Sequence, residues 1–389
     1  MVTDSDALLL AQTFQQGRMP ALRVLDLSRN QRLTEVGMVG LFEGVVESEE
    51  GLPFLEVLDL SFTKAGGGLG SLGRALASGK LKRLSQIAMR RSGVTTVAIG
   101  ALEPHVRAGA LAGLVSLYFS DNSEVPGEVW GDFLRAVGAS ERGMPKLRSL
   151  DLSARLPGAA RVPGAGGVGL RAGLVWGKLK RVSRLNLKYA NLTDETVRGL
   201  AAAVKAEALV GLIDLNLCGN ASVSREAWMK FPQALLESNR GLPELRQLDL
   251  SQTQAGAAAP LLGRALLSKK LVQLSRINLR RSSLVAETVR YGALAGLTAL
   301  SLSGNLNVGE GAWGDFLRAL VECEVGQPHL RSLNLSETNA GKESAIAMAL
   351  LLGRLGRLSN VTCRAPYNFT WTQRILRLLF IVVFRTDDE

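Results

Sequence analysis

The stretch Leu55-Glu56-Val57-Leu58-Asp59-Leu60 decides the fold of this 389-residue chain. Its residues alternate, so Leu58 and Leu60 point to one side of an extended backbone while Val57 and Asp59 point to the other. A period of two is typical of a short β-strand with one buried face. We therefore predict a short strand here, with its leucines turned toward a core.

The same LxxLxL pattern occurs twelve times along the chain. Successive copies are 28 to 35 residues apart, except for one interval of 23. Helical patterns such as 313–320 lie between the copies. One such unit cannot bury its apolar face alone, whereas stacked units share a continuous core, so the chain is predicted to be a solenoid. The copies begin at Leu22, Leu55, Leu84, Leu114, Leu147, Val182, Leu212, Leu245, Leu274, Leu297, Leu330 and Leu358.

These repeats resemble, in pattern and length, the leucine-rich repeats of the ribonuclease-inhibitor-like class. The resemblance covers about residues 1–364. It implies an α/β solenoid of about 12 repeats, a horseshoe with parallel strands on the concave face and helices on the convex face. It also implies a role in recognition, because proteins of this class commonly bind globular partners inside the horseshoe.

A polar column is expected at the turn three residues after the last leucine of each strand. Asn, Thr and Ser follow one another there with a period of three repeats, broken only by Arg155 and Ala190. Such side chains bond to nearby backbone, and the backbone groups of a buried turn need partners, so the column is predicted to be structural. Its members are Asn30, Thr63, Ser92, Asn122, Arg155, Ala190, Asn220, Thr253, Ser282, Asn305 and Thr338.

The period of three repeats recurs outside this column. Ser-x-Thr-x-Ala-Gly occurs at 61–66, 251–256 and 336–341. Helices of the first repeat type carry Trp130, Trp228 and Trp313, with Phe42 in the related helix of the first triplet. This period favours duplication of a three-repeat segment.

Three segments depart from the regular array, which is assigned to residues 1–364. Residues 1–21 contain the helix half of a repeat without its strand, so they form either a partial first repeat, in a chain cut short, or a cap. Residues 155–173, rich in Gly, Pro and Ala, are expected to bulge as a binding loop or a tolerated insertion. Residues 365–389 contain the apolar run 375–384, which is shorter than the roughly 20 residues that span a bilayer. We expect a capping segment there, with shallow membrane insertion as an alternative.

The cellular compartment is predicted from the N-terminal sequence and from the cysteines. Residues 1–20 have no basic start and only a short apolar run, unlike a signal peptide. The cysteines Cys218, Cys323 and Cys363 are odd in number and scattered, whereas extracellular arrays usually carry disulfide-linked caps. A cytoplasmic location is therefore expected.

The net charge of +11 is concentrated on the third repeat of each triplet. The windows 80–91, 178–188, 269–281 and 354–364 hold 18 Lys or Arg and no Asp or Glu. Cations before these strands are expected near the end of the preceding helix, where positive charge is favoured by the helix dipole. Strands between the basic ones carry Asp or Asn, so the predicted strand face is striped.

Two explanations of the stripes remain open. In the first, charged residues of neighbouring strands pair with one another, which contributes little stability at a surface. In the second, the strand face docks an acidic partner, since charged patches steer association. On the second explanation the partner-binding residues of the concave face are Arg90, Arg148, Lys188, Arg246, Arg280, Arg331, Asp59, Asp151 and Asp249.

The sequence gives little support to catalysis. His105 and His329 have no nucleophile or metal-ligand partner at useful spacing. The stretch 66–70 is rich in glycine but lacks the ending of a phosphate-binding loop, so these are predicted to be turn glycines. We expect no enzymatic activity, no cofactor and no metal.

The leading hypothesis is a non-catalytic scaffold that binds a protein partner through the concave strand face and adjoining loops. A second hypothesis is a regulator of a small GTPase, because the Ran GTPase-activating proteins are similar in repeat class and length. That family ends in an acidic tail, however, and this chain ends in an apolar one. A third, less favoured hypothesis is binding to nucleic acid or an anionic membrane, suggested by a pI near 9.9. Aromatic residues make up only 5% of the chain and do not alternate with the basic rungs, which argues against it.

Overall fold

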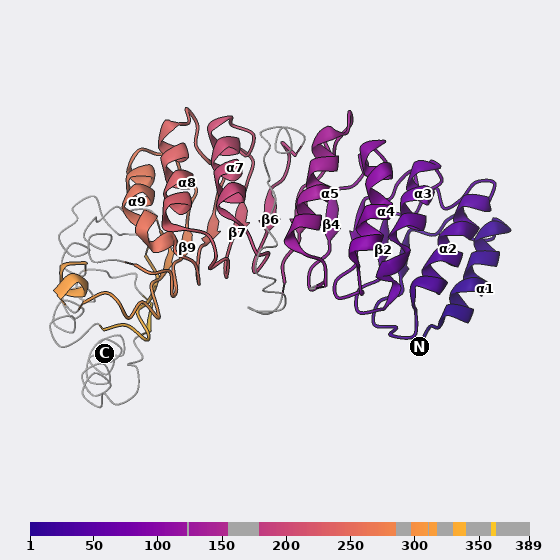
Figure 1. Ribbon diagram of the computed structural model, residues 1–389, viewed down its shortest axis with the longest axis horizontal. Helices are drawn as coiled ribbons and strands as arrows, with labels where there is room; N and C mark the ends of the chain where they lie inside the picture. Colours follow the sequence, from indigo (N-terminus) through magenta and orange to yellow (C-terminus); the bar gives the residue numbers. More distant parts are fainter. Residues whose placement is uncertain are drawn as a thin grey trace, which may run out of the picture. The chain divides into compact units, whose positions relative to one another are not determined.

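The computed structural model describes residues 1–122, 124–154, 179–284, 297–309, 311–316, 330–339 and 359–362. The chain divides into two compact units, Met1–Leu215 and Asn216–Glu389. Both units are built from short parallel strands that alternate with helices (Figure 1).

The first unit begins with a helix and continues as strand–helix repeats. Its elements are α1 (Asp4–Gln15), β1 (Val24–Asp26), α2 (Glu35–Glu47), β2 (Val57–Asp59), the 3-10 helix η1 (Ala65–Gly68), α3 (Leu69–Ala77), β3 (Gln86–Ala88), α4 (Thr96–Arg107), β4 (Ser116–Tyr118), α5 (Gly127–Ala139), β5 (Ser149–Asp151), β6 (Arg184–Asn186) and α7 (Asp194–Lys205). Strand β7 (Asp214–Asn216) lies at the division between the units.

The second unit repeats the same alternation. Its elements are α8 (Arg225–Glu237), β8 (Gln247–Asp249), the 3-10 helix η2 (Ala255–Ala258), α9 (Ala259–Leu267), β9 (Arg276–Asn278), β10 (Ala299–Ser301), β11 (Ser332–Asn334) and β12 (Asn360–Thr362). Strand order follows chain order throughout. Strands β1 to β6 pair in parallel, as do β8 to β12, with equivalent residues in register.

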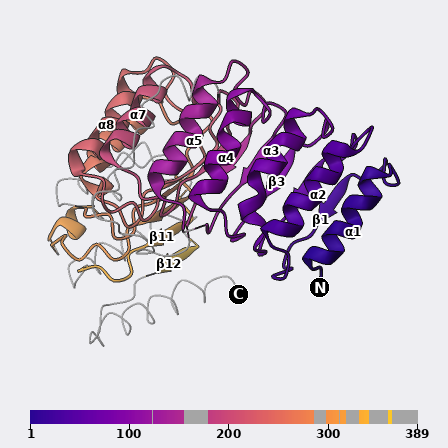
Figure 2. The same cartoon turned by 45° about the vertical axis from the view of Figure 1, so that its right-hand side comes forward.

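Strands β1 to β11 bury their central apolar residue, and in all of them except β3 both flanking residues are half-buried or exposed. In β2, Leu58 is fully buried while Val57 and Asp59 are half-buried. The helices pack on the buried side of the strands. Helices α1 to α5 lie side by side in chain order, as Figures 1 and 2 both show. The predicted fold class is confirmed: this is a leucine-rich repeat solenoid with one layer of parallel strands and one layer of helices.

The helices begin at residues that the sequence makes good caps. The hydroxyls of Thr3, Thr34, Thr95 and Ser224 accept hydrogen bonds from backbone N–H groups in the first turns of their helices. Such caps satisfy donors that otherwise lack partners. Thr3 belongs to a capping box in which Asp6 bonds back to the backbone of Thr3.

The polar turn column has the structural role predicted for it. Every described Asn, Thr or Ser of the column donates a hydrogen bond from its side chain to the carbonyl three residues earlier. These bonds are Asn30 to Leu27, Thr63 to Leu60, Ser92 to Met89, Asn122 to Phe119, Asn220 to Leu217, Thr253 to Leu250, Ser282 to Leu279, Asn305 to Leu302 and Thr338 to Leu335. At Ala190 the backbone N–H makes the equivalent bond, to Leu187. Arg155 lies outside the described residues.

The Ser-x-Thr-x-Ala-Gly motif joins one repeat to the next. The hydroxyl of Thr63 accepts a hydrogen bond from the N–H of Ala65, and the N–H of Gly66 bonds to the carbonyl of Ser92 at 2.8 Å. The second copy makes the same bonds with Thr253, Ala255 and Gly256. The end of the third copy lies outside the described residues. The motif therefore builds the start of η1 and η2 and holds it against the following turn.

Helix α1 occupies the place of a repeat helix beside α2. The carboxylate of Asp4 accepts hydrogen bonds from the N–H and hydroxyl of Thr34, at 2.7 Å each, and from the N–H of Gly37 at 3.2 Å. Whether residues 1–21 serve as a cap or a partial repeat stays a prediction. The predicted insertion 155–173 and the predicted capping segment 365–389 lie outside the described residues.

Two lysines donate hydrogen bonds to carbonyls at the C-terminal ends of helices. Each of these helices belongs to the repeat before the one that the sequence predicts. Lys80 Nζ donates to the carbonyl of Ser48 at 2.7 Å and to that of Glu49, just after α2. Lys270 Nζ donates to the carbonyls of Ser238 and Asn239 at 2.8 and 2.9 Å, just after α8. Cations were expected at the preceding helix of the same repeat. The side chains instead reach the neighbouring repeat, where the final carbonyls of a longer helix lack partners.

Replacing Lys80 with Met should lower the free energy of unfolding by about 1 kcal/mol, because two helix-terminal carbonyls lose a charged donor. Equilibrium urea denaturation would measure the change. Lys82→Met is the matched control: Lys82 is exposed two residues away, makes no hydrogen bond or ion pair in the described structure, and should change stability by less than about 0.5 kcal/mol. Equal effects of the two variants would contradict the role given to Lys80.

Candidate functional site

The candidate site is the side of the strands that faces away from the helices. We call the first and third residues of each strand the strand face. The residue before each strand forms its N-terminal edge. Each strand is followed by one further apolar residue, and the two residues after that one form its C-terminal edge. The register brings equivalent residues of successive strands together, for example Asp26 beside Asp59 and Tyr118 beside Asp151. Every predicted partner-binding residue belongs to one of these three rows.

The predicted carboxylates Asp59, Asp151 and Asp249 are the third residues of their strands. Each accepts a hydrogen bond from the backbone N–H two residues later, at 2.8, 3.0 and 2.9 Å. Asn186, Asn278 and Asn334 accept the same bond in their strands. Only an acceptor oxygen is needed, which explains why both Asp and Asn occur in this row. These residues therefore have a local structural role, and their role in partner binding stays a prediction.

The same local bond perturbs Asp26 at the start of the row. Hydrogen bonds from the hydroxyl and the N–H of Ser28 lower the pKa of the Asp26 carboxyl, because both stabilise the ionised form. The row carries Asp26, Asp59 and Asp151 in the first unit and Asp249 in the second. A partner that meets the strand face must present donors or cations to this row.

At the C-terminal edge of the first unit, two predicted cations lie against tyrosine rings. The guanidinium carbon of Arg90 is 4.5 Å from the centroid of Tyr118, and Lys188 Nζ is 5.2 Å from that of Tyr189. Arg90 is exposed and forms no ion pair among the described residues. A cation over an aromatic face is held in place without losing its charge. Arg90 and Tyr118 are therefore ordered and still available to a partner.

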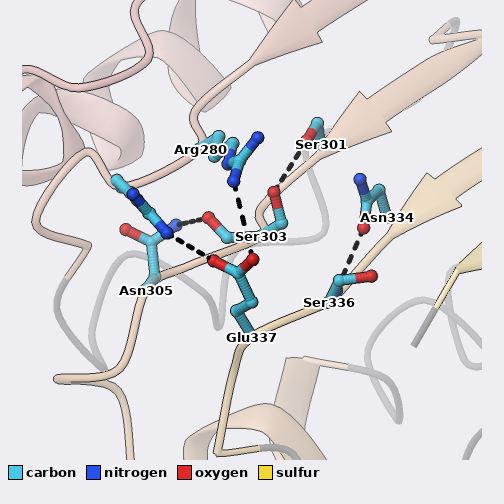
Figure 3. A network of polar contacts seen from close by, with 8 residues as sticks. Arg280, Ser301, Ser303, Asn305, Asn334, Ser336 and Glu337 are labelled. Carbon is cyan, nitrogen blue, oxygen red and sulfur yellow. Dashed lines mark hydrogen bonds and ion pairs between the residues drawn. The ribbon is translucent and has the colours of Figure 1, made fainter. Parts of the chain in front are cut away.

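In the second unit the two equivalent arginines share one carboxylate. Arg280 lies 3.6 Å and Arg281 lies 2.7 Å from carboxylate oxygens of Glu337, which is two repeats further along the chain (Figure 3). The Arg281 side chain passes over Gly304, where a Cβ would lie 2.5 Å from its Cγ. The hydrogen bond from Arg281 holds the pKa of the Glu337 carboxyl below its usual value. Internal ion pairing thus accounts for Arg280, but not through the neighbouring rung that the sequence suggested.

The N-terminal edge carries Arg148, Arg246 and Arg331. Their carbonyls each accept two backbone N–H bonds from the next strand, for example from Ser183 and Arg184 to Arg148. Their side chains are exposed, and within the described residues none of the three forms an ion pair. The backbone of this edge is therefore fixed while its guanidinium groups face solvent.

Sequence reasoning missed a row of left-handed residues at the C-terminal edge. Phe62, Arg91, Gln252 and Arg281 have φ between 48° and 59°, and each donates its N–H to a carbonyl of the next repeat. Side chains of many types occupy this row although left-handed backbone favours glycine. The positions therefore have no shared residue type, and only their fixed offset from each strand could have identified them.

The glycines, histidine and metal-binding residue types that catalytic sites use have other surroundings here. The glycines of 66–70 lie in η1 and α3 rather than in a turn, and a Cβ on Gly68 or Gly70 would meet Met38 or Ala101 of neighbouring helices. Burial lowers the pKa of His105 in α4. In the part of the chain that the structure describes, no group of three His, Cys, Asp or Glu is placed to hold a metal ion. None of the described helices has the length and apolar character needed to cross a membrane.

This chain is similar to solved structures only at low sequence identity. No protein-family model matches the chain. A search of curated proteins likewise finds no match. Among solved structures, a chain of the yeast Rad7–Elc1 complex is 14% identical with a TM-score of 0.48, over 95% of this chain and 86% of that one. A chain of the TLR13–ssRNA13 complex is 14% identical with a TM-score of 0.41, over 90% of this chain and 37% of that one.

Proposed function

We propose that this protein is a non-catalytic interaction scaffold that binds a protein partner through its strand face. One observation carries the proposal: Arg90 is exposed, stacked on Tyr118, and without a carboxylate partner among the described residues. Arg and Tyr are the residue types most enriched among those that dominate binding energy at protein interfaces. A stacked pair also loses little side-chain entropy on binding, because its geometry exists before the partner arrives.

The surroundings of this pair fit a protein surface of mixed charge. Tyr118 lies between Ala88 and Asp151 in register, and Asp59 lies beside Ala88 on the other side. Cations, an aromatic ring and carboxylates thus occur within four neighbouring strands. Alternating charge across an interface selects a partner with the complementary pattern and rejects others.

The proposal extends to the class and location of the protein. The repeat length and the α-helices between strands support the ribonuclease-inhibitor-like class. A cytoplasmic location is part of the proposal because the three cysteines lack the spacing of disulfide-linked caps. No described residue favours regulation of a small GTPase over simple binding.

The test compares partner binding by wild type and by Arg90→Glu with Tyr118→Ala. Proteins captured from a lysate of the source are identified by mass spectrometry, and the candidate is then purified for calorimetric titration. The double variant should bind at least about thirtyfold more weakly, because a central Arg–Tyr pair contributes about 2 kcal/mol or more. Arg225→Glu on α8, an exposed cation at the helix layer, is the control and should bind like wild type.

Three outcomes would contradict the proposal. Unchanged affinity of the double variant would show that the partner does not use this part of the strand face. A loss of partner affinity in Arg225→Glu as large as that in the Arg90 and Tyr118 variant would show that binding depends only on the net charge of the protein. Recovery of nucleic acid in place of a protein would favour the hypothesis of an anionic-polymer binder.

A further inference from the structure

Nearly all of the net charge of the protein lies in one stretch of the chain. Residues 142–193 contain eleven Lys or Arg and a single acidic residue, Asp151, while the whole chain has a net charge of +11. The remaining residues are therefore almost neutral as a group. The basic windows of the other repeats add little to this total, because acidic residues elsewhere in the chain offset them.

Five of these cations gather at one place in the first unit. Lys146 and Arg148 precede β5, Lys180 and Arg181 precede β6, and Arg184 is the first residue of β6. All five are exposed. The two strands are adjacent, since Ser149 pairs with Arg184 and the Arg148 carbonyl accepts the N–H groups of Ser183 and Arg184 at 2.8 and 2.9 Å. We call this group the β5–β6 basic cluster.

At the equivalent positions beside β2 and β3, the cations have partners within the protein. There Phe54 and Glu56 stand where β5 has Lys146 and Arg148. The Arg83 guanidinium carbon lies 4.6 Å from the Phe54 centroid, and Arg23 pairs with Glu56 at 2.9 Å. In the β5–β6 basic cluster, the cations Lys146 and Arg148 occupy the positions of these two partners.

No described residue neutralises the cluster. None of its five side chains forms an ion pair within the described residues. Asp151 accepts hydrogen bonds from the N–H and hydroxyl of Ser153, at the opposite end of β5. Five uncompensated cations repel one another, and such concentrated fields attract and hold anions.

We propose that the β5–β6 basic cluster holds an acidic segment of the protein partner, with Arg148 and Arg184 pairing its carboxylates. This inference rests on the proposed function and names the chemistry of the bound segment. Arginine binds carboxylates through two parallel N–H bonds, and two guanidiniums on neighbouring strands can grip successive acidic side chains.

A protein segment fits better than a nucleic acid for two reasons. First, the third residue of β5 is Asp151, so a continuous phosphate backbone crossing the strand face would meet a carboxylate. Second, residues 146–149 and 180–184, which contain the cluster, include no aromatic residue, whereas binders of single strands combine cations with rings on which bases stack. A peptide places its acidic side chains singly and can leave the Asp151 position to a donor.

The test uses defined probes on the full chain. Binding of a fluorescein-labelled decapeptide of glutamate is measured by anisotropy at near-physiological salt, beside a neutral Gly-Ser decapeptide and a ten-nucleotide single strand. Wild type should bind the glutamate peptide and neither of the others comparably. Arg148→Glu with Arg184→Glu should weaken that binding at least about tenfold, because two charge-assisted pairs are lost and two like charges are placed beside the peptide.

The control carries the same change of charge elsewhere. Arg225→Glu with Lys230→Glu, on exposed positions of α8, should bind the glutamate peptide within about twofold of wild type. The milder pair Arg148→Gln and Arg184→Gln, checked for native circular dichroism, separates loss of binding from loss of folding.

Three results would overturn the inference. The first is that wild type binds the glutamate peptide no more tightly than the neutral peptide. The second is that the α8 control variant loses as much affinity for the glutamate peptide as the Arg148 and Arg184 variant. The third is that wild type binds the oligonucleotide more tightly than the glutamate peptide and that the Arg148 and Arg184 variant loses this binding. Because the assay contains no natural partner, its failure leaves the Arg90 and Tyr118 test unaffected. If the protein uses Arg90 but not the cluster, the Arg90 and Tyr118 variant loses partner binding while wild type fails to bind the glutamate peptide.

Discussion

Replacing Asn122 with Ala should lower the free energy of unfolding by about 4 kcal/mol, because several buried backbone groups lose their partners at once. The amide of Asn122 donates to the carbonyls of Met89 and Phe119 at 2.7 and 2.8 Å. Its oxygen accepts the N–H groups of Ser92 and Val94 at 3.0 and 3.1 Å. One side chain thus satisfies the turns of two successive repeats.

Equilibrium urea denaturation followed by circular dichroism would measure this loss. Asn239→Ala is the matched control, since Asn239 is exposed and its side chain makes no hydrogen bond in the described structure, so the change should stay within about 0.5 kcal/mol. A loss below 1 kcal/mol at Asn122 would contradict the bridging role. Asn305 makes the same bonds to Ser282, Leu284 and Leu279, so Asn305→Ala should behave alike in the second unit.

Gly66→Ala should destabilise the protein by about 3 kcal/mol, because the new methyl group has no space. A Cβ on Gly66 would lie 2.3 Å from the backbone nitrogen of Val94 and 2.5 Å from the carbonyl carbon of Gly93. Backbone atoms of the next turn cannot move aside as a flexible side chain can. The close approach also carries the hydrogen bond from Gly66 to Ser92, so any shift would lengthen it.

Gly100→Ala tests the same chemical change where space exists. Gly100 lies exposed in α4 with no atom within 4 Å of an added Cβ. Alanine there should raise stability by about 0.5 to 1 kcal/mol, because glycine is a poor helix former. Thermal and urea denaturation of the two variants should therefore move in opposite directions. A neutral Gly66→Ala would show that the two turns are not packed as described.

Asn122 and Gly66 also illustrate why the sequence repeats every three units. Asn122 serves the turn of Ser92, one repeat earlier, and Gly66 packs against the same region from the other side. The Thr, Ser and Asn repeats therefore form one interlocked set, which recurs as Thr253, Ser282 and Asn305. A set of three whose members depend on each other explains a period of three in structural terms.

The sequence by itself determined the features that depend on contacts between residues close along the chain. The alternation in 55–60 predicted the strand and its buried face, and Leu58 is buried as expected. The turn column was predicted from residue type, because an Asn, Thr or Ser side chain can reach a carbonyl three residues away whatever else the chain does. Repetition then fixed the solenoid, since identical units stack in only a few ways.

Only the tertiary structure decided which partners the charged side chains have. Arg90 and Arg280 occupy equivalent positions in sequence, yet one lies over Tyr118 and the other pairs with Glu337. Lys80 likewise bonds to carbonyls of another repeat, after α2. The physical reason is that ion pairs and ring contacts depend on which side chains of different repeats face each other. The pattern within one repeat contains no information about its neighbour's side chains, so it predicts the scaffold but not the charge that the scaffold leaves exposed.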